Sequence, residues 1–234
     1  MTETTPPKKS DLGVRAASAM VMIAVAGTAL WLGGWVWTAF VALVGCVALW
    51  EWLALVRRFA PNLAGNAVWT IFGILYIGVA CAMALALRNL IGGPLDALQI
   101  LAVVVATDVG AYFAGRTIGG PKIAPAISPS KTWAGLFGGM IGAGLTMLAF
   151  MPWTFHDFDP NYWFALGALP AAGGMVAAVV AQAGDFLESW MKRRAGVKDS
   201  SSLIPGHGGV MDRVDGLLAV LFALAVFLFV GSIV

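Results

Sequence analysis

Residues 189–215 read SWMKRRAGVKDSSSLIPGHGGVMDRVD and bring charge and glycine into an otherwise apolar chain. The stretch holds five of the fourteen Lys and Arg residues and three of the twelve Asp and Glu residues, with apolar segments on both sides. Charges next to hydrocarbon are costly unless they are paired or have a function. The stretch therefore predicts a functional loop between two membrane-spanning helices.

The composition as a whole indicates a membrane protein. Hydrophobic residues make up 60% of the 234 residues and charged residues only 11%, unlike a soluble domain. About 20 mostly apolar residues are needed to cross a bilayer as a helix. We therefore expect an all-α, polytopic bundle of about seven transmembrane helices; a break within a long window would raise the count to eight or nine. The expected helices are 14–31, 33–50, 66–87, 95–116, 133–151, 163–184 and 214–233.

The chain is expected to have three regions. Residues 1–12 are polar and proline-bearing, which favours a disordered tail. Residues 13–94 form generic transmembrane helices. Residues 95–234 carry the candidate chemistry, with cytoplasmic loops at 117–132 and 185–213.

The basic residues are expected on one side of the bundle. If seven helices alternate, thirteen of the fourteen Lys and Arg residues fall on the side of the N-terminus, and only Arg88 falls on the other. Cytoplasmic connections are enriched in basic residues. We therefore expect a cytoplasmic N-terminus, with both large loops facing the cytoplasm.

The fourth expected helix and the loop after it form the first candidate region. Asp108 lies within the span, where an unpaired carboxylate is expensive. The glycine-rich run before Lys122 resembles a phosphate-binding loop, but no Ser or Thr follows the lysine, so the Walker pattern is absent. Lys131 and Thr132 directly precede the fifth helix, whose N-terminal amides are suited to an anion.

Residues 182–215 form the second candidate region. If residues 184–194 are helical, Asp185, Glu188, Ser189 and Lys192 share one face. The loop that follows alternates basic and acidic side chains around small residues, which let the backbone approach a ligand closely. This combination suits a polyphosphate with its Mg²⁺.

Two residues have open roles. His207 is either a general base or a brace for the loop around it. Glu51, at the inner end of the second span, is a second-tier site residue that we expect to pair with Arg57 or Arg58.

Several blocks of the chain resemble one enzyme family. A series of motif residues follows at fixed gaps along the chain: Ser189, Lys192-Arg193, Lys198-Asp199-Ser200, Pro205 to Gly209 and Asp212 to Asp215. This run looks like the signature of the phosphatidate cytidylyltransferases. The blocks GDFLES (184–189) and ISPSKTWAG (127–135) are similar to further blocks of that family. The likeness covers about the C-terminal half of the chain.

The resemblance implies that CTP and phosphatidic acid give CDP-diacylglycerol and pyrophosphate, as a step of phospholipid biosynthesis. It implies Mg²⁺, a second, monovalent cation such as K⁺, and a homodimer. It also implies a prokaryotic-type cytoplasmic membrane with the site on its cytoplasmic face. No nucleic-acid partner is expected.

The resemblance carries metal binding over to Asp185 and Asp212, with Asp108, Asp199 and Asp215 as further candidates at the metal. The expected catalytic residues are Asp185, Asp212, Lys192, Lys131 and Ser189. The expected substrate-binding residues are Lys131, Lys192, Arg193, Lys198, Asp199, His207, Gly208, Gly209, Arg213 and Asp108.

Three positions depart from the family pattern. Ala134 stands where Glu is common, Ser201 where Gly is usual, and Gly216 where Ser usually follows the last Asp. None of the three removes a charged residue of the signature.

Four other functions compete with this interpretation. A CTP-dependent lipid kinase of the polyprenol type would transfer the γ-phosphate and release CDP. A transporter would use Asp108 in an ion pathway, but the charges gather at one face instead of crossing the bilayer. A membrane scaffold gives no reason for the PGHGG run, and the motif of CDP-alcohol phosphotransferases is absent from the sequence.

Overall fold

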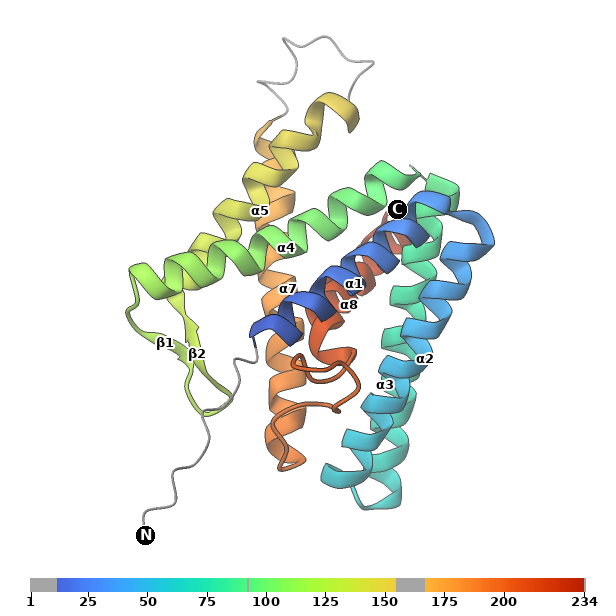
Figure 1. Cartoon of the computed structure of the whole chain (residues 1–234), viewed down its shortest axis with the longest axis vertical. Helices are drawn as coiled ribbons and strands as arrows, with labels where there is room; N and C mark the ends of the chain where they lie inside the picture. Colours follow the sequence, from blue (N-terminus) through green and yellow to red (C-terminus); the bar gives the residue numbers. More distant parts are fainter. Residues whose placement is uncertain (1–11, 92, 155–166, 234) are drawn as a thin grey trace.

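The computed structural model describes residues 12–91, 93–154 and 167–233. In these ranges seven helices are long and apolar enough to cross a membrane, as the sequence predicted (Figure 1). The helices are α1 (Leu12–Leu32), α2 (Gly34–Phe59), α3 (Leu63–Ala86), α4 (Pro94–Thr117), α5 (Trp133–Thr154), α7 (Ala168–Arg194) and α8 (Met211–Gly231). A π-helical turn, η1 (Leu87–Ile91), extends α3. Apart from Leu12, which begins α1, the predicted tail lies outside the described residues.

Two helices are longer than their apolar windows. α2 continues nine residues beyond the predicted end at residue 50, and α7 continues ten residues beyond residue 184. Both extensions carry charged side chains among apolar ones, so hydropathy alone ends the helices too early. α7 thus includes residues 185–194 of the predicted sixth loop, and the connection that remains is 195–210.

The helices pack in two groups. α4 and α5 cross closely and α5 packs against α7, whereas α2, α3 and α8 form the second group, which α7 joins through α8 (Figure 1). Glycines permit the close crossing: a Cβ on Gly110 of α4 would lie 2.4 Å from the carbonyl oxygen of Gly138 of α5.

An aromatic core fixes α2 against its neighbours. Trp52 is fully buried and its indole Nε1 donates to the carbonyl of Trp69, at 2.9 Å. Trp69 in turn lies 5.3 Å, centroid to centroid, from Trp190 of α7. Buried aromatic side chains contribute much of the packing energy of a core. The C-terminal half of α2 is therefore held against Trp69 of α3, which in turn packs on α7.

The polar connections gather at one end of the bundle. We call this the loop end; it consists of the α2–α3 turn, residues 118–132 and residues 195–210 (Figure 1). Arg88 lies at the opposite end, where its Nε donates to the carbonyl of Leu30 at 2.6 Å and its Nη2 to that of Trp31 at 3.0 Å. The one basic residue outside the predicted segregation thus satisfies the last carbonyls of α1.

The predicted loop 117–132, between α4 and α5, contains a β-hairpin. Strands β1 (Lys122–Ala124) and β2 (Ser128–Thr132) pair antiparallel. Thr132 is buried, and its hydroxyl accepts from the backbone N–H of Gly135 at 3.1 Å, which caps the start of α5. The hairpin holds Lys131 of β2 next to α7.

Candidate active site

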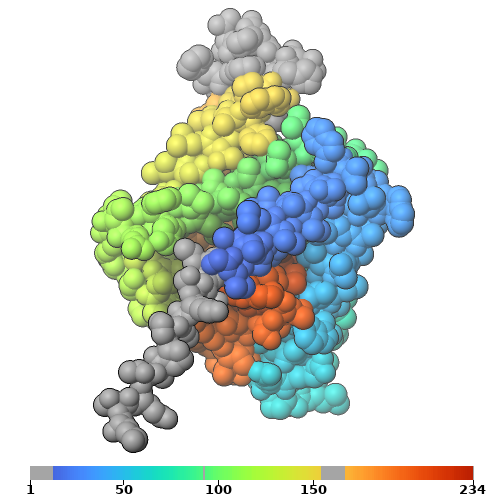
Figure 2. All heavy atoms as spheres, viewed as in Figure 1, coloured from blue at the N-terminus to red at the C-terminus, as the bar shows by residue number. Residues whose placement is uncertain are grey.

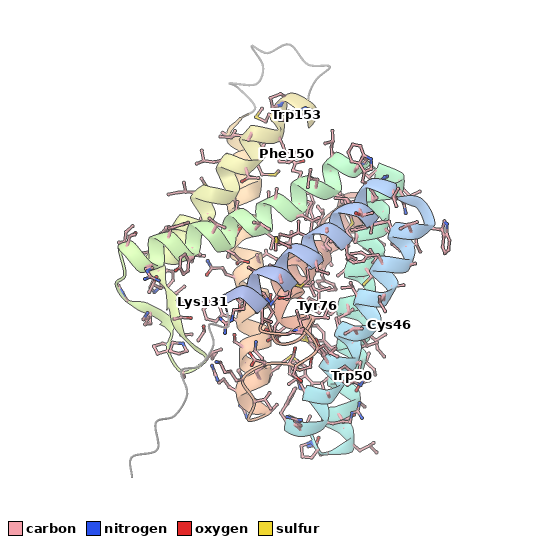
Figure 3. All side chains as sticks on the ribbon, viewed as in Figure 1. Cys46, Trp50, Tyr76, Lys131, Phe150 and Trp153 are labelled. Atoms are coloured by element: carbon pink, nitrogen blue, oxygen red, sulfur yellow. The ribbon has the colours of Figure 1, made fainter. Side chains whose placement is uncertain are left out.

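The first cavity lies at the loop end among α4, α5, α7 and β2 and has a volume of about 390 Å³. Its polar lining includes Asp108 and Arg116 of α4, Lys131 of β2 and Asp185 of α7. The ammonium group of Lys131 is hydrogen-bonded to Oδ2 of Asp185 and lies 4.9 Å from the ring centre of Phe186. Figure 3 shows Lys131 between the hairpin and α7. Two residues predicted from separate blocks therefore meet here.

Asp108 belongs to the same cavity. It interacts electrostatically with Asp185, Lys131 and Arg213. Asp215 of α8 also interacts with Asp185 and Lys131. The intramembrane acid predicted from the sequence is thus part of the candidate site, not an isolated charge within the span.

Lys192 links α7 to α8 through an ion pair with Asp212. Its ammonium group lies 2.7 Å from Oε2 of Glu188 and 2.6 Å from Oδ1 of Asp212. The prediction that residues 184–194 are helical is confirmed, and on this part of α7 Asp185, Glu188 and Lys192 all form ion pairs. Glu188 is buried, and within the described residues its other oxygen, Oε1, has no hydrogen-bond partner. A buried carboxylate oxygen without a donor is costly, so Oε1 of Glu188 favours a cation or a hydrogen-bond donor beside it.

Asp212 organises the loop 195–210. Its Oδ2 accepts from the backbone N–H of Ser200 at 2.9 Å, the hydroxyl of Ser200 at 2.7 Å and the N–H of Gly209 at 2.8 Å. Lys192 binds its other oxygen, and only 4% of the side chain is exposed. Both oxygens of Asp212 are therefore engaged in holding the loop.

Glu51 has a role that the sequence did not predict. Instead of pairing with Arg57 or Arg58, its buried carboxylate reaches the start of α8. It accepts from the N–H groups of Val210 at 3.0 Å and Met211 at 2.6 Å, and from the hydroxyl of Ser201. A carboxylate that accepts from the first amides of a helix stabilises that end. No signal in the sequence pointed to this contact, because the partners are about 150 residues apart.

Glycine is required where these two carboxylates meet the loop. A Cβ on Gly209 would lie 2.0 Å from the hydroxyl of Ser200 and 2.5 Å from Oε1 of Glu51. Gly208, at φ 84°, adopts a conformation that side chains disfavour. The two glycines predicted to bind substrate therefore allow the loop to close around Asp212 and Glu51.

A second cavity, of about 430 Å³, lies between this loop and the first turns of α1. Its lining includes predicted residues, namely Lys198, Asp199, His207, Gly208 and Arg213. It also includes Arg15, which the sequence analysis did not select. His207 is held from α1, since its Nδ1 lies 2.8 Å from the hydroxyl of Ser18. This contact is consistent with the bracing role left open for this histidine.

Several predicted site residues line neither cavity, among them Lys192, Asp212, Arg193 and Ser189. The exposed Arg193 donates to the carbonyl of Ile127 at 3.3 Å, which ties α7 to the hairpin. Ser189 is half-buried on α7 and makes no side-chain hydrogen bond with the described residues.

The donor set fits Mg²⁺ in its chemistry. Within the described residues, no three His, Cys, Asp or Glu side chains are assembled to hold a metal alone. Mg²⁺ does not need such a cage, because it keeps several waters and uses one or two carboxylates with substrate phosphates. Asp108 and Asp185 line one cavity, and 33% of the Asp185 side chain is exposed. Asp212 would have to exchange the Lys192 ammonium for the ion.

Comparison with known proteins matches nearly the full length of the chain to one family. The profile of the cytidylyltransferase family matches residues 13–67 and 62–231. A phosphatidate cytidylyltransferase of Brucella suis is 33% identical, over 93% of both chains. One of Rickettsia bellii is 31% identical, over 90% of this chain and 88% of its own. One of Haemophilus influenzae is 46% identical over 52% of this chain and 41% of its own. The protein therefore belongs to the cytidylyltransferase family.

Proposed function

We propose that this protein is a phosphatidate cytidylyltransferase, which transfers CMP from CTP to phosphatidic acid and gives CDP-diacylglycerol and pyrophosphate. The observation that carries the proposal is the convergence of the two sequence blocks. Lys131 of the hairpin binds Asp185 of α7, and Lys192 binds Asp212 of α8, at one end of a membrane bundle. Relatives of that name match nearly the full chain.

The first cavity is suited to the lipid phosphate. Its polar residues lie on the membrane-spanning helices α4 and α7 and on strand β2. The large apolar side chains of Phe113 and Trp133, which adjoin the lining residues Tyr112 and Thr132 in sequence, are exposed. Membrane-spanning helices expose such side chains to lipid. Lys131 and Arg116 would neutralise the phosphate while the acyl chains stay in the bilayer.

The reaction is a nucleotidyl transfer. An oxygen of the lipid phosphate attacks the α-phosphorus of CTP, the bond from that phosphorus to the bridging oxygen of the β-phosphate breaks, and pyrophosphate leaves. The phosphate monoester is largely dianionic near neutral pH, so the attacking oxygen needs little help from a base. The protein's task is to position two anions and to offset their charge.

We further propose Mg²⁺ as the metal, with Asp185 as its first protein ligand. Asp108 and Asp215 interact electrostatically with Asp185 and are the further candidate carboxylates; Asp212 and a monovalent cation are the additional parts that the family likeness suggests. When bound, the ion would neutralise the phosphate charge that develops at the leaving group.

The orientation and assembly are also proposals. The gathering of basic residues at the loop end supports a cytoplasmic loop end and N-terminus. A homodimer follows from the family likeness alone. Cysteine labelling from each side of the membrane tests the orientation, and mass measurement of the protein in nanodiscs tests the dimer.

The test of the activity uses purified protein in nanodiscs with CTP and phosphatidic acid. Formation of CDP-diacylglycerol with equimolar pyrophosphate supports the proposal. Release of CDP with a phosphorylated lipid would assign a lipid kinase instead. Absence of either product at all Mg²⁺ concentrations would contradict an enzyme of this class.

A further inference from the structure

The two cavities of the loop end differ in charge. Among the described residues, the second cavity is lined by three cationic side chains, Arg15, Lys198 and Arg213, and one carboxylate, Asp199. The first is lined by two cationic side chains and two carboxylates, and so is balanced. An excess of positive charge concentrates polyanions. The second cavity therefore suits the more highly charged of two anionic substrates.

The cavities also differ in what surrounds them. The second is formed by the polar loop 198–208, by Arg15 in the first turn of α1 and by Arg213 in the first turn of α8, and not by the middle of membrane-spanning helices. Its volume, about 430 Å³, lies within the range of roughly 300–1,000 Å³ that is usual for small-molecule pockets. A water-soluble anion can reach it without crossing the lipid phase.

α1 is held against this loop by specific contacts. The hydroxyl of Ser18 lies 2.8 Å from Nδ1 of His207 and 3.1 Å from the carbonyl oxygen of Pro205. A Cβ on Gly206 would lie 2.9 Å from Cγ of Arg15, so the side chain of Arg15 rests on the loop backbone. Figure 2 shows the orange-red loop emerging directly beside the first turns of α1. Arg15 is therefore placed by packing at the wall of the cavity.

The two cavities are close enough to share one reaction. Lys192 lies seven residues after Asp185 of the first cavity on α7, and it binds Asp212, whose neighbour in sequence, Arg213, lines the second cavity. A nucleotide whose α-phosphorus faces the first cavity would extend its terminal phosphates toward Arg213.

We propose that the second cavity binds the β- and γ-phosphates of the nucleoside triphosphate, and that Arg15 of α1 is one of the residues that bind them. The inference rests on the proposed function for the identity of the nucleotide. When the α-phosphorus bonds to the lipid oxygen, the leaving pyrophosphate carries the electron pair of the broken bond and stays in this cavity until release. α1 is then part of the active site, and not only a membrane anchor.

The experiment measures steady-state kinetics of the full chain in nanodiscs, with inorganic pyrophosphate as an inhibitor competing with CTP. Replacing Arg15 by Ala removes a charge-assisted contact to phosphate, worth about 1.5–3 kcal/mol, which is about a tenfold to hundredfold change. We expect Arg15→Ala to raise KM for CTP and Ki for pyrophosphate by at least about tenfold, while KM for phosphatidic acid changes less than twofold. Arg15→Lys, which keeps the charge, is expected to recover most of the loss.

Two control variants separate binding from structure. Arg58→Ala removes an exposed positive charge at the same end of the bundle and is expected to leave all three constants unchanged. Ser18→Ala removes a hydroxyl contact of α1 without changing charge. If Ser18→Ala raised Ki for pyrophosphate as much as Arg15→Ala, and Arg15→Lys recovered nothing, Arg15 would have only a packing role and the proposal would fail.

A rise in KM for phosphatidic acid alone would reassign the cavity to the lipid and overturn the proposal. Failure of the proposed function gives a different result, since the wild-type protein would then form no CDP-diacylglycerol. Equilibrium binding of radiolabelled pyrophosphate to wild type and Arg15→Ala tests the cavity in either case. Equal binding to both proteins contradicts it.

Discussion

Asp185 and Asp212 each bind a lysine, yet their surroundings differ. One third of the Asp185 side chain is exposed, and it faces a cavity with Asp108, whereas 4% of Asp212 is exposed and three donors of the loop occupy one of its oxygens. A carboxylate that faces a cavity can change partners during a reaction, whereas one saturated by backbone amides holds a conformation. Much of the charge in residues 189–215 therefore builds the loop. The reacting groups come partly from elsewhere in the chain.

The largest expected effect on catalysis is that of Asp185→Asn. The change keeps the shape but removes a charge in the cavity, so kcat is expected to fall about 10²–10³-fold, the usual effect of losing one electrostatic group of an active site. The Mg²⁺ concentration for half-maximal rate is expected to rise, with the thermal unfolding temperature unchanged. CDP-diacylglycerol formation across a Mg²⁺ titration measures both.

A matched control is Asp96→Asn, in the first turn of α4 at the opposite end. Its kinetics are expected to equal those of the wild type. If Asp185→Asn also kept wild-type turnover and Mg²⁺ dependence, Asp185 would lose its place at the metal.

Asp212→Asn is expected to act on stability as well as on rate. It leaves the Lys192 ammonium facing an amide, and breaking a buried ion pair from one side costs about 3–5 kcal/mol. We expect a lower unfolding temperature and faster proteolysis within residues 195–210, at every Mg²⁺ concentration. Thermal unfolding and limited proteolysis in detergent measure this. A variant with unchanged stability but altered Mg²⁺ dependence would show that Asp212, like Asp185, acts at the metal and not by holding the loop.

Glu51→Gln tests how α2 holds the loop 195–210 and the start of α8. The amide places a donor toward the N–H groups of Val210 and Met211 or the hydroxyl of Ser201, so part of the cap is lost. The expected cost is about 1–2 kcal/mol, the range for a lost helix cap, with kcat about tenfold lower. KM for phosphatidic acid is expected to stay within twofold, because the first cavity is not lined by α2. Unchanged kcat would reduce Glu51 to a packing role.

The sequence predicted the number of helices because long apolar windows leave few alternatives in a bilayer. It also predicted the residues that meet in the site, since the Lys131, Asp185 and Asp212 blocks could be recognised by their likeness to a family. It could not predict the contacts that hold them. The apolar window of α2 ends before Glu51, and the nearest basic residues, Arg57 and Arg58, are local, whereas the real partners lie in a loop about 150 residues away. Contacts of this kind arise from packing of α2 beside α7, for which hydropathy gives no signal.

Ser201→Gly has the smallest expected effect and restores the residue usual in the family. The hydroxyl donates to Oε1 of Glu51 and accepts from the N–H of Leu203 at 3.2 Å, so its loss is expected to cost about 1 kcal/mol and at most about a fivefold change in rate. Ser202→Gly is the stability control, because Ser202 is exposed and its hydroxyl has no partner among the described residues. In the Glu51→Gln background, Ser201→Gly should cost less than in the wild type, since the two groups contact each other. Additive costs in the double variant would show that Ser201 does not act through Glu51. The loop would then be held by Asp212 and the backbone amides alone.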